Sequence, residues 1–331
     1  MNVEMKSKVD LMAENFQELK GAFAWDSNLI KHFGALITAT RESRVDIDRA
    51  KEIKHFIKEQ TAWTSFFRGS NEMIFAMLLQ GESDYQGLFQ KSMKVYEDLK
   101  KQGFNRGTYL PLAAYVIAKN AEESRYEDVY VRMEQIYKKM KNNHFWLTSQ
   151  DDYMLAAVLA SSELDVDHTS QDMEACYQLL NQAGLYKGNE LQNLTHVLSL
   201  GEETAEVKCE NAIKIQKILK ASPSKLRYQG LASLGVLALV TDQPEQIAAE
   251  VIEVYDYLYK REGYGFWGIE SSMRAILSAT IVSDYYADQM GGGLLEATLA
   301  NSITAILIAQ QTAMIAAIAA SSAAASASAS S

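Results

Sequence analysis

The fold of this chain is decided by one stretch, His144-Phe145-Trp146-Leu147-Thr148-Ser149-Gln150-Asp151-Asp152-Tyr153-Met154-Leu155-Ala156-Ala157-Val158-Leu159-Ala160. An aromatic turn leads into a helix whose first turn carries two acids and whose body consists of small apolar residues. Ser149 and Asp152 have the spacing of a capping box, in which each side chain accepts a hydrogen bond from the backbone N–H of the other residue. The stretch therefore predicts a helix that begins near Ser149 and is buried on all sides.

Variants of this stretch recur along most of the chain. A large residue marks the middle of each preceding helix, at Phe56, Tyr96, Tyr137, Tyr177, Ile215 and Tyr255, with separations of 40, 41, 40, 38 and 40 positions. A turn rich in glycine or aromatic residues follows, and then an Ala/Leu-rich helix. Two helices in a period of about 40 residues indicate stacked helical hairpins. We predict an all-α protein with about six such hairpins in residues 48–290.

The two helices of each unit differ in pattern. The second helices are apolar all round, as at Ala113-Ala114 and Ala156-Ala157, which is typical of an interior layer. The first helices are amphipathic, which is typical of an outer layer. Two such layers predict a curved array, and the period alone leaves open whether the array closes into an α/α toroid or stays an open α-solenoid.

The two ends of the chain depart from the repeat. Residues 1–47 predict a helical lead-in with apolar residues at helical spacing. After the break at Gly291-Gly292-Gly293, residues 291–320 predict an apolar C-terminal helix, and residues 321–331 a disordered tail of only Ala and Ser. The C-terminal helix could dock on the protein or join two copies of the chain. Attachment to a membrane through this helix is a minor alternative, because Asn301, Gln310 and Gln311 and the lack of a flanking basic cluster disfavour it.

Composition excludes several classes of function. The net charge is −10 with no dense Lys/Arg tract, so we expect no nucleic-acid partner. Cys176 and Cys209 are isolated among apolar residues, and the N-terminal residues lack a secretory pattern, so we expect a cytoplasmic protein without disulfides. The five histidines show no zinc-ligand spacing, and no phosphate-binding or nucleophile motif is present, so we predict neither a metal nor a cofactor.

Asp151 and Asp152 are the first candidates for chemistry. Adjacent acids at a helix start beside an aromatic turn could act as a general acid or bind a metal–diphosphate. Acids in a first helical turn also complement the helix dipole, and Asp152 completes the box with Ser149. We expect the capping role for both acids and keep catalysis as the alternative.

A second set of candidates lies in or just after the repeat turns, at the same end of the hairpins as Asp151. These residues, which we predict to line one polar turn face and bind a ligand or partner, are Arg68, Arg106, Arg227, Glu270 and Arg274. Aromatic residues in the same turns are predicted to plug the hairpin ends as part of the core, namely Trp63, Phe66, Phe67, Phe145, Trp146, Phe266 and Trp267.

The chain also resembles a bacterial protein family known only as a domain of unknown function. The resemblance rests on the turn Leu147-Thr148-Ser149-Gln150-Asp151-Asp152-Tyr153 with its Leu155-Ala156-Ala157 helix, and on the tail Leu295–Ala317 with Asn301-Ser302-Ile303 and Ala309-Gln310-Gln311-Thr312. It implies an uncharacterised, cytoplasmic, all-helical protein and supplies no catalytic residues.

Two functions of different class follow from these observations. The first is a non-catalytic helical-repeat protein that binds a protein partner or a small ligand on its polar turn face. The second is an α/α-toroid enzyme that acts on a sugar, isoprenoid or phosphorylated substrate through Asp151 or Asp152. The second function requires these acids to converge with Arg106 and Arg227 around one cavity.

Overall fold

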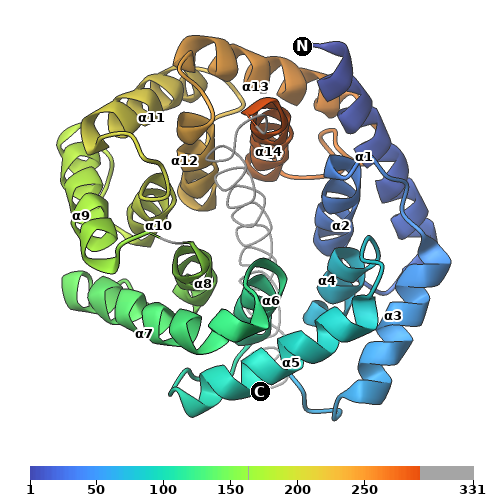
Figure 1. Ribbon diagram of the computed structural model, residues 1–331. Helices are drawn as coiled ribbons and strands as arrows, with labels where there is room; N and C mark the ends of the chain where they lie inside the picture. The colour runs from blue at the N-terminus through green and yellow to red at the C-terminus, as the bar shows by residue number, and fades with distance from the viewer. Residues whose placement is uncertain (163, 291–331) are drawn as a thin grey trace, which may run out of the picture.

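The computed structural model describes residues 1–162 and 164–290 of the chain, and all of the regular structure in these residues is helical. The helices alternate between an outer and an inner layer of a ring (Figure 1). The outer layer consists of α1 (Val3–Ala22), α3 (Ile47–Gln60), α5 (Tyr85–Lys101), α7 (Tyr126–Asn143), α9 (Val166–Gln182), α11 (Ala205–Lys220) and α13 (Pro244–Tyr259). The inner layer consists of α2 (Asn28–Thr40), α4 (Ser70–Leu79), α6 (Leu110–Asn120), α8 (Tyr153–Ser161), α10 (Asn189–Leu198), α12 (Leu231–Leu239) and α14 (Ser271–Met290). Three short 3₁₀ turns precede α7, α8 and α12, namely η1 (Glu123–Arg125), η2 (Gln150–Asp152) and η3 (Tyr228–Gly230).

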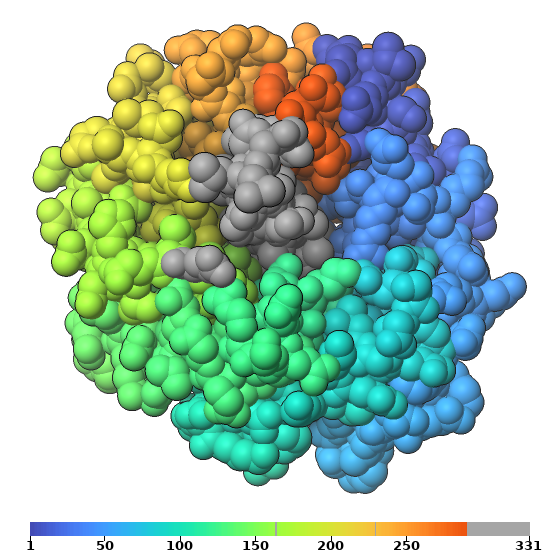
Figure 2. Space-filling view, in the orientation of Figure 1, coloured from blue at the N-terminus to red at the C-terminus, as the bar shows by residue number. Residues whose placement is uncertain are grey.

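The predicted all-α array of hairpins is confirmed, and the array closes. Each outer helix packs on the inner helix that follows it, and α1 packs against both α13 and α14. Figure 2 shows the first helix, in blue, beside the last hairpin, in orange. Residues 1–47, predicted as a lead-in, form the hairpin α1/α2 of this same ring. The apolar helix and the tail predicted for residues 291–331 lie outside the described residues.

Burial follows the two sequence patterns. In α8 every residue from Tyr153 to Ala160 is buried, and in α4 the same holds from Asn71 to Leu79. The outer helix α3 buries only Ala50, Ile53 and Ile57, which lie on one face at helical spacing. The inner layer is therefore enclosed on all sides, while each outer helix keeps a polar face toward solvent.

Two outer helices end in the same hydrogen-bond pattern. After α5, the N–H of Phe104 donates to Leu99 O and the N–H of Gly103 to Lys100 O, and Gly103 has a φ of 97°. After α9, Gly184 has the same φ of 97°, and the N–H of Leu185 donates to Leu180 O. This is a Schellman ending, which needs a left-handed residue and therefore favours glycine. It turns the chain sharply from the outer to the inner layer.

An ion-pair cluster joins the first helix to the last one. The Lys8 Nζ of α1 lies 2.7 Å from Asp284 Oδ2 and 2.8 Å from Asp288 Oδ2, both on α14. Lys8 and Asp284 are both buried. Burial raises the pKa of Asp284 to about 6 although Lys8 opposes the shift, and the two acids together hold the pKa of Lys8 above its usual range. At neutral pH the pair is therefore charged and enclosed.

Further contacts continue this seam toward the other end of the ring. Asp10 on α1 accepts from Arg261 Nε at 2.7 Å and from the hydroxyl of Tyr257 at 2.9 Å. The His32 ring stacks on Phe16 with centroids 3.8 Å apart and meets Tyr264 edge-on at 4.6 Å. Burial lowers the pKa of His32 to about 3, so this ring is neutral and packs as an apolar group. The seam thus combines the buried Lys8–Asp284 pair and the half-buried Asp10–Arg261 pair with an aromatic core.

Replacement of Lys8 by Met should destabilise the ring by about 3–5 kcal/mol, because Asp284 then stays buried without its partner. Urea unfolding measures this loss, and the double variant Lys8→Met/Asp284→Asn should recover part of it. Lys6→Met, two residues away at an exposed position whose Nζ lies 5.7 Å from the centroid of the Tyr257 ring, is the matched control. Equal stability of the Lys8 and Lys6 variants would contradict a closing role for the pair.

Among the helices of the described ranges, none combines the length and the apolar character needed to cross a bilayer.

Candidate functional site

The ring has two ends of different character. The connections from outer to inner helices lie at one end, which we call the turn face, and comprise residues 23–27, 61–69, 102–109, 144–152, 183–188, 221–230 and 260–270. The connections from inner to outer helices form the opposite face, residues 41–46, 80–84, 121–125, 162 with 164–165, 199–204 and 240–243. All the site residues predicted from the sequence belong to the turn face or to the first turn of α14.

Asp152 forms the predicted capping box at the start of α8. The backbone N–H of Ser149 donates to Asp152 Oδ2 at 2.8 Å, and the Ser149 side chain completes the box. The Asp152 carboxyl is fully buried. Burial, and next the neighbouring charge of Asp151, raise its pKa to about 8, while the N–H of Ser149 acts in the opposite direction. Asp152 is therefore mostly protonated at neutral pH.

A polar cluster surrounds this carboxyl between α8 and α10. Asp151 Oδ2 accepts from Asn189 Nδ2 at 2.9 Å, and Thr148 Oγ1 accepts from Gln192 Nε2 at 2.9 Å. Asp152 Oδ1 lies 3.8 Å from Nδ1 of the buried His196. Burial lowers the pKa of His196 to about 3, so the imidazole is neutral. A protonated carboxyl beside a neutral imidazole can share its proton with Nδ1 or with a polar ligand.

Several polar atoms of this cluster are buried without a hydrogen-bond partner in the described part of the chain. They are Asp152 Oδ1, His196 Nδ1, Asn189 Oδ1 and Gln192 Oε1. Such groups are rare in native proteins, because each costs about 1–3 kcal/mol when unpaired. The sequence pointed to Asp152 by its box spacing, but nothing in the sequence indicated that α10 brings His196 and Gln192 to it.

The cluster does not match a metal centre. Within residues 1–162 and 164–290, no group of three His, Cys, Asp or Glu side chains is placed to hold a metal ion. The chemistry open to the cluster is hydrogen bonding to an uncharged polar group, or proton donation by Asp152.

The arginines predicted for the turn face divide into two groups. Arg274 is buried and donates to the carbonyl oxygens of Tyr264 and Ile269 and to the Tyr255 hydroxyl, at 2.6, 2.9 and 2.8 Å. Arg68 donates in the same way to the carbonyl oxygens of Lys58, in the last turn of α3, and of Thr61. Both arginines therefore stabilise the conformation of a neighbouring loop.

The remaining predicted residues are exposed and dispersed. Arg106, Arg227 and Glu270 lie on three different connections. No hydrogen bond or ion pair within the described residues joins any of the five predicted ligand-binding residues to Asp151 or Asp152. The convergence that an enzyme of this type requires is therefore absent from the described contacts.

The aromatic residues of the turn face correct one prediction. Phe67 is buried as expected, but Phe145, Trp146, Phe266 and Trp267 are exposed, and so are Trp63 and Phe66. The prediction that they plug the hairpin ends is wrong because other residues of the same connections fill the core, such as Phe67 in residues 61–69 and Tyr264 and Ile269 in residues 260–270. The exposed rings project from the ends that these residues close.

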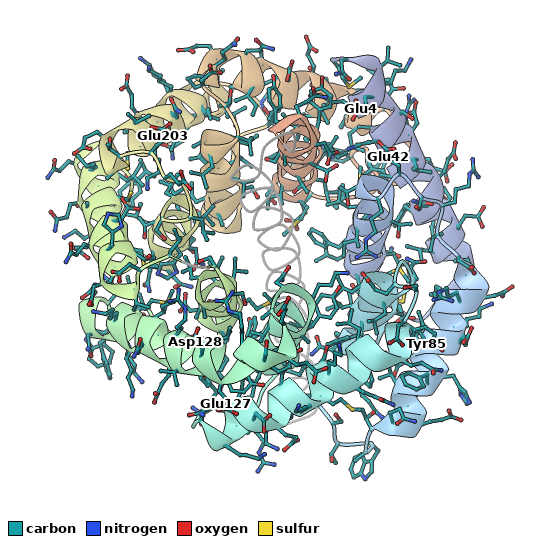
Figure 3. All side chains as sticks on the ribbon, viewed as in Figure 1. Glu4, Glu42, Tyr85, Glu127, Asp128 and Glu203 are labelled. Carbon is teal, nitrogen blue, oxygen red and sulfur yellow. The ribbon has the colours of Figure 1, made fainter. Side chains whose placement is uncertain are left out.

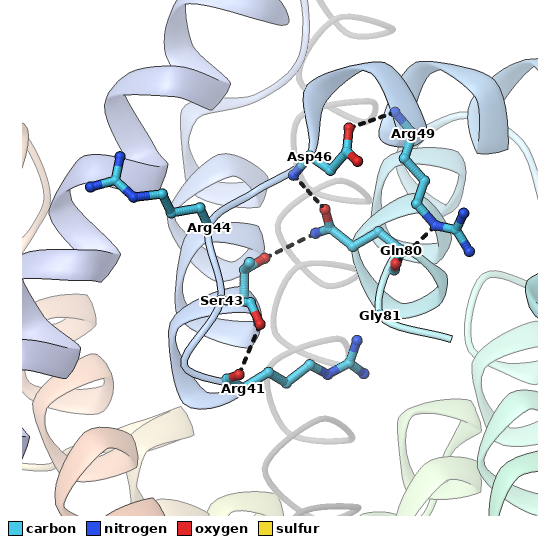
Figure 4. A pocket seen from close by; sticks show the side chains of 8 residues that line it. Arg41, Ser43, Arg44, Asp46, Arg49, Gln80 and Gly81 are labelled. Atoms are coloured by element: carbon cyan, nitrogen blue, oxygen red, sulfur yellow. Dashed lines mark hydrogen bonds between the residues drawn. The ribbon is translucent and has the colours of Figure 1, made fainter. Parts of the chain in front are cut away.

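The opposite face holds a pocket of about 210 Å³ that the sequence did not indicate (Figure 4). It contains three arginines, but their donors are already engaged. Arg41 donates to Leu78 O, Arg49 to Gln80 O and Glu82 O, and Arg44 to Glu14. These bonds join residues 41–46 to α1 and α4, and α3 to residues 80–84, so the pocket is part of the framework.

We expect the unfolding free energy to fall by up to about 1.4 kcal/mol per pH unit between about pH 4 and about pH 8 through Asp152 alone. Its folded pKa exceeds the unfolded value of 3.8, so its stabilisation is complete at low pH and is lost as pH rises through about 8. Urea unfolding across this range should show a steeper decline for the native chain than for Asp152→Asn. Asp242→Asn, an exposed acid on the opposite face, is the matched control. Parallel pH profiles for the native chain and Asp152→Asn would contradict the neutral carboxyl.

Comparison with known proteins identifies the family and no activity. Residues 15–312 match the family described as "Protein of unknown function (DUF4003)". The chain is 27% identical over 323 residues to "Uncharacterized protein YeaA" of Bacillus subtilis (strain 168), which covers 96% of this chain and 94% of that protein. No solved structure matches. The predicted resemblance to an uncharacterised bacterial family is thus confirmed, and the chain belongs to the DUF4003 family of proteins of unknown function.

Proposed function

We propose that this protein is a non-catalytic helical ring that binds a partner through its turn face. One observation carries the proposal. Every large aromatic side chain that is exposed in the described part of the chain lies on the turn face or at the end of the outer helix that leads into it. These residues are Trp25, Trp63, Phe66, Phe145, Trp146, Tyr186, Tyr228, Tyr259, Phe266 and Trp267.

The distribution of these side chains supports a binding function, because a random placement of exposed aromatic residues would not favour one end of the ring. Each connection of the turn face except residues 102–109 presents at least one exposed ring. Exposed tryptophan and tyrosine are concentrated at interaction sites, where they bury a large area and lose little conformational entropy. The opposite face presents none within the described residues. A selection for surface contact at one end accounts for this asymmetry.

An α/α-toroid enzyme that acts on a sugar, isoprenoid or phosphorylated substrate through Asp152 is the second candidate. The pKa of Asp152, raised to about 8, favours it, since a general acid works best near the operating pH. Two observations argue against the enzyme: the Asp152 carboxyl is fully buried, and the predicted arginines lie apart from it. A substrate would have to reach an acid that the described side chains enclose.

We further place the protein in the cytoplasm. Cys176 and Cys209 are free, buried and close enough for the Cys209 Sγ to approach Cys176 O at 3.8 Å. Thiols of this kind are typical of a reducing compartment. This location limits the partners to cytoplasmic proteins, small ligands and the inner surface of the cell membrane.

Photo-crosslinking in bacterial cells tests the binding function. A photoreactive phenylalanine derivative placed at Trp146 or at Trp267 in the full chain should give discrete adducts. The same group at Val207, an exposed residue near the opposite end of α11, is the control and should give few. Adducts at Val207 as abundant as those at Trp146 and Trp267, or neither protein nor lipid adducts at either tryptophan, would reject a turn-face interaction.

A further inference from the structure

The turn face carries a second feature besides its aromatic rings, namely a positive surface charge. We propose that the face docks on the surface of a negatively charged lipid bilayer. This inference rests on the proposed binding function and names its partner. Three properties of the face support it: the type of aromatic residue, the geometry of the ring, and the distribution of charge between its two ends.

The residue type is the first property. The sequence has four tryptophans, and all four lie on the turn face with relative exposures of 102% for Trp25, 84% for Trp63, 92% for Trp146 and 95% for Trp267. Tryptophan prefers the boundary between lipid headgroups and acyl chains, because its ring is apolar while its N–H still finds a polar partner. Four tryptophans that are exposed in the connections at one end of the ring are suited to this boundary.

The geometry is the second property. The connections 23–27, 61–69, 144–152, 183–188, 221–230 and 260–270 are spread around the whole circumference of the ring, as Figure 1 shows by the order of the helices. A peptide or a nucleic-acid strand follows a groove and would use adjacent connections. An extended flat surface can meet all of them at once. The pairs Phe145–Trp146 and Phe266–Trp267 pack edge to face, at 5.3 and 5.0 Å between centroids, so each pair projects as one wedge.

The charge on the turn face is the third property. In its connections and in the adjoining last turns of the outer helices, exposed basic residues outnumber exposed acidic residues. The exposed basic residues are Lys20, Lys58, Lys101, Arg106, Lys141, Lys187, Lys217, Lys220, Arg227 and Lys260. The exposed acidic residues are Glu59, Asp256, Glu262 and Glu270. Basic side chains beside interfacial aromatic residues are the composition of surfaces that bind anionic lipids.

The opposite face has the reverse composition. Its exposed acids, counting the first turns of the outer helices, are Glu42, Asp46, Asp48, Asp84, Glu122, Glu123, Glu127, Asp128, Asp165, Asp167, Glu202, Glu203, Glu206, Asp242 and Glu245. Figure 3 labels Glu42, Glu127, Asp128 and Glu203 among them. A chain of net charge −10 is repelled as a whole by an anionic surface, so only an approach through the turn face is favourable. The charge distribution therefore fixes the orientation of the docked ring.

Vesicle binding by the full-length protein tests this inference directly. With vesicles of phosphatidylcholine alone and of phosphatidylcholine mixed with phosphatidylglycerol, sedimentation should show binding about tenfold or more tighter to the anionic lipid, weakened by salt. Because all four tryptophans leave water on docking, their fluorescence should shift to shorter wavelength in the same titration.

Variants of the full chain assign the contact to the turn face. Trp146→Gln/Trp267→Gln should reduce binding to anionic vesicles by about tenfold and diminish the fluorescence shift. Lys187→Glu/Arg227→Glu should reduce binding by a similar factor. Arg44→Glu/Lys51→Glu, with Lys51 exposed near the start of α3, makes the same charge change at the opposite end of the ring and should leave binding unchanged.

Absence of binding to anionic vesicles would overturn the inference. So would binding that both turn-face variants retain in full, since another part of the chain would then make the contact, or displacement of the vesicles by a single-stranded oligonucleotide. Protein adducts from Trp146 in the crosslinking experiment, without vesicle binding, would reject the lipid partner and leave the binding function standing. Absence of adducts and of vesicle binding would reject both.

Discussion

The structure depends on the seam between its first and last hairpins, where Lys8 of α1 meets Asp284 of α14. A stack of helical hairpins buries its interior by contact between neighbours, so the two terminal hairpins of an open stack would each leave an apolar face exposed. Closure of the ring buries both of these apolar faces. The charge pair does not supply the driving force, since burial costs each ion several kcal/mol. It selects this register of α1 on α14 over others, while the stack of Phe16, His32 and Tyr264 supplies apolar burial.

The charge difference between the two ends follows from helix electrostatics. Acids are favoured at helix N-termini and bases at C-termini. All outer helices begin at the opposite face and end at the turn face, so each contributes to the same polarity. The inner helices run the other way, but they carry few charged residues and do not compensate. The segregated charge is therefore a product of the ring, whereas the exposed tryptophans have no such structural cause. For that reason the aromatic residues, and not the charges alone, carry the functional proposal.

In the cluster at Asp152, one carboxyl group both caps a helix and keeps an oxygen atom that can still form a hydrogen bond. Its Oδ2 closes the capping box, and its Oδ1 faces His196 without a hydrogen bond in the described structure. Tyr109 is part of the same environment, since burial, and next the charge of Asp151, raise its pKa to about 12. A neutral carboxyl, a neutral imidazole and a phenol form an uncharged polar interior. Such an interior suits recognition of a polar group better than binding of an ion.

The sequence by itself determined the all-α class, the hairpin period, the division into buried and amphipathic helices, and the box of Ser149 and Asp152. These features are local, because each depends on residues at most one repeat apart. It could not determine closure, which rests on contacts such as Lys8–Asp284 across nearly the whole chain. Nor could it place His196 beside Asp152, because that contact depends on how α10 packs on α8. The exposure of Trp146 and Trp267 was likewise decided by the tertiary structure. Whether an aromatic ring is buried depends on which side chains fill the end of the hairpin. The sequence of the turn does not show which of them do.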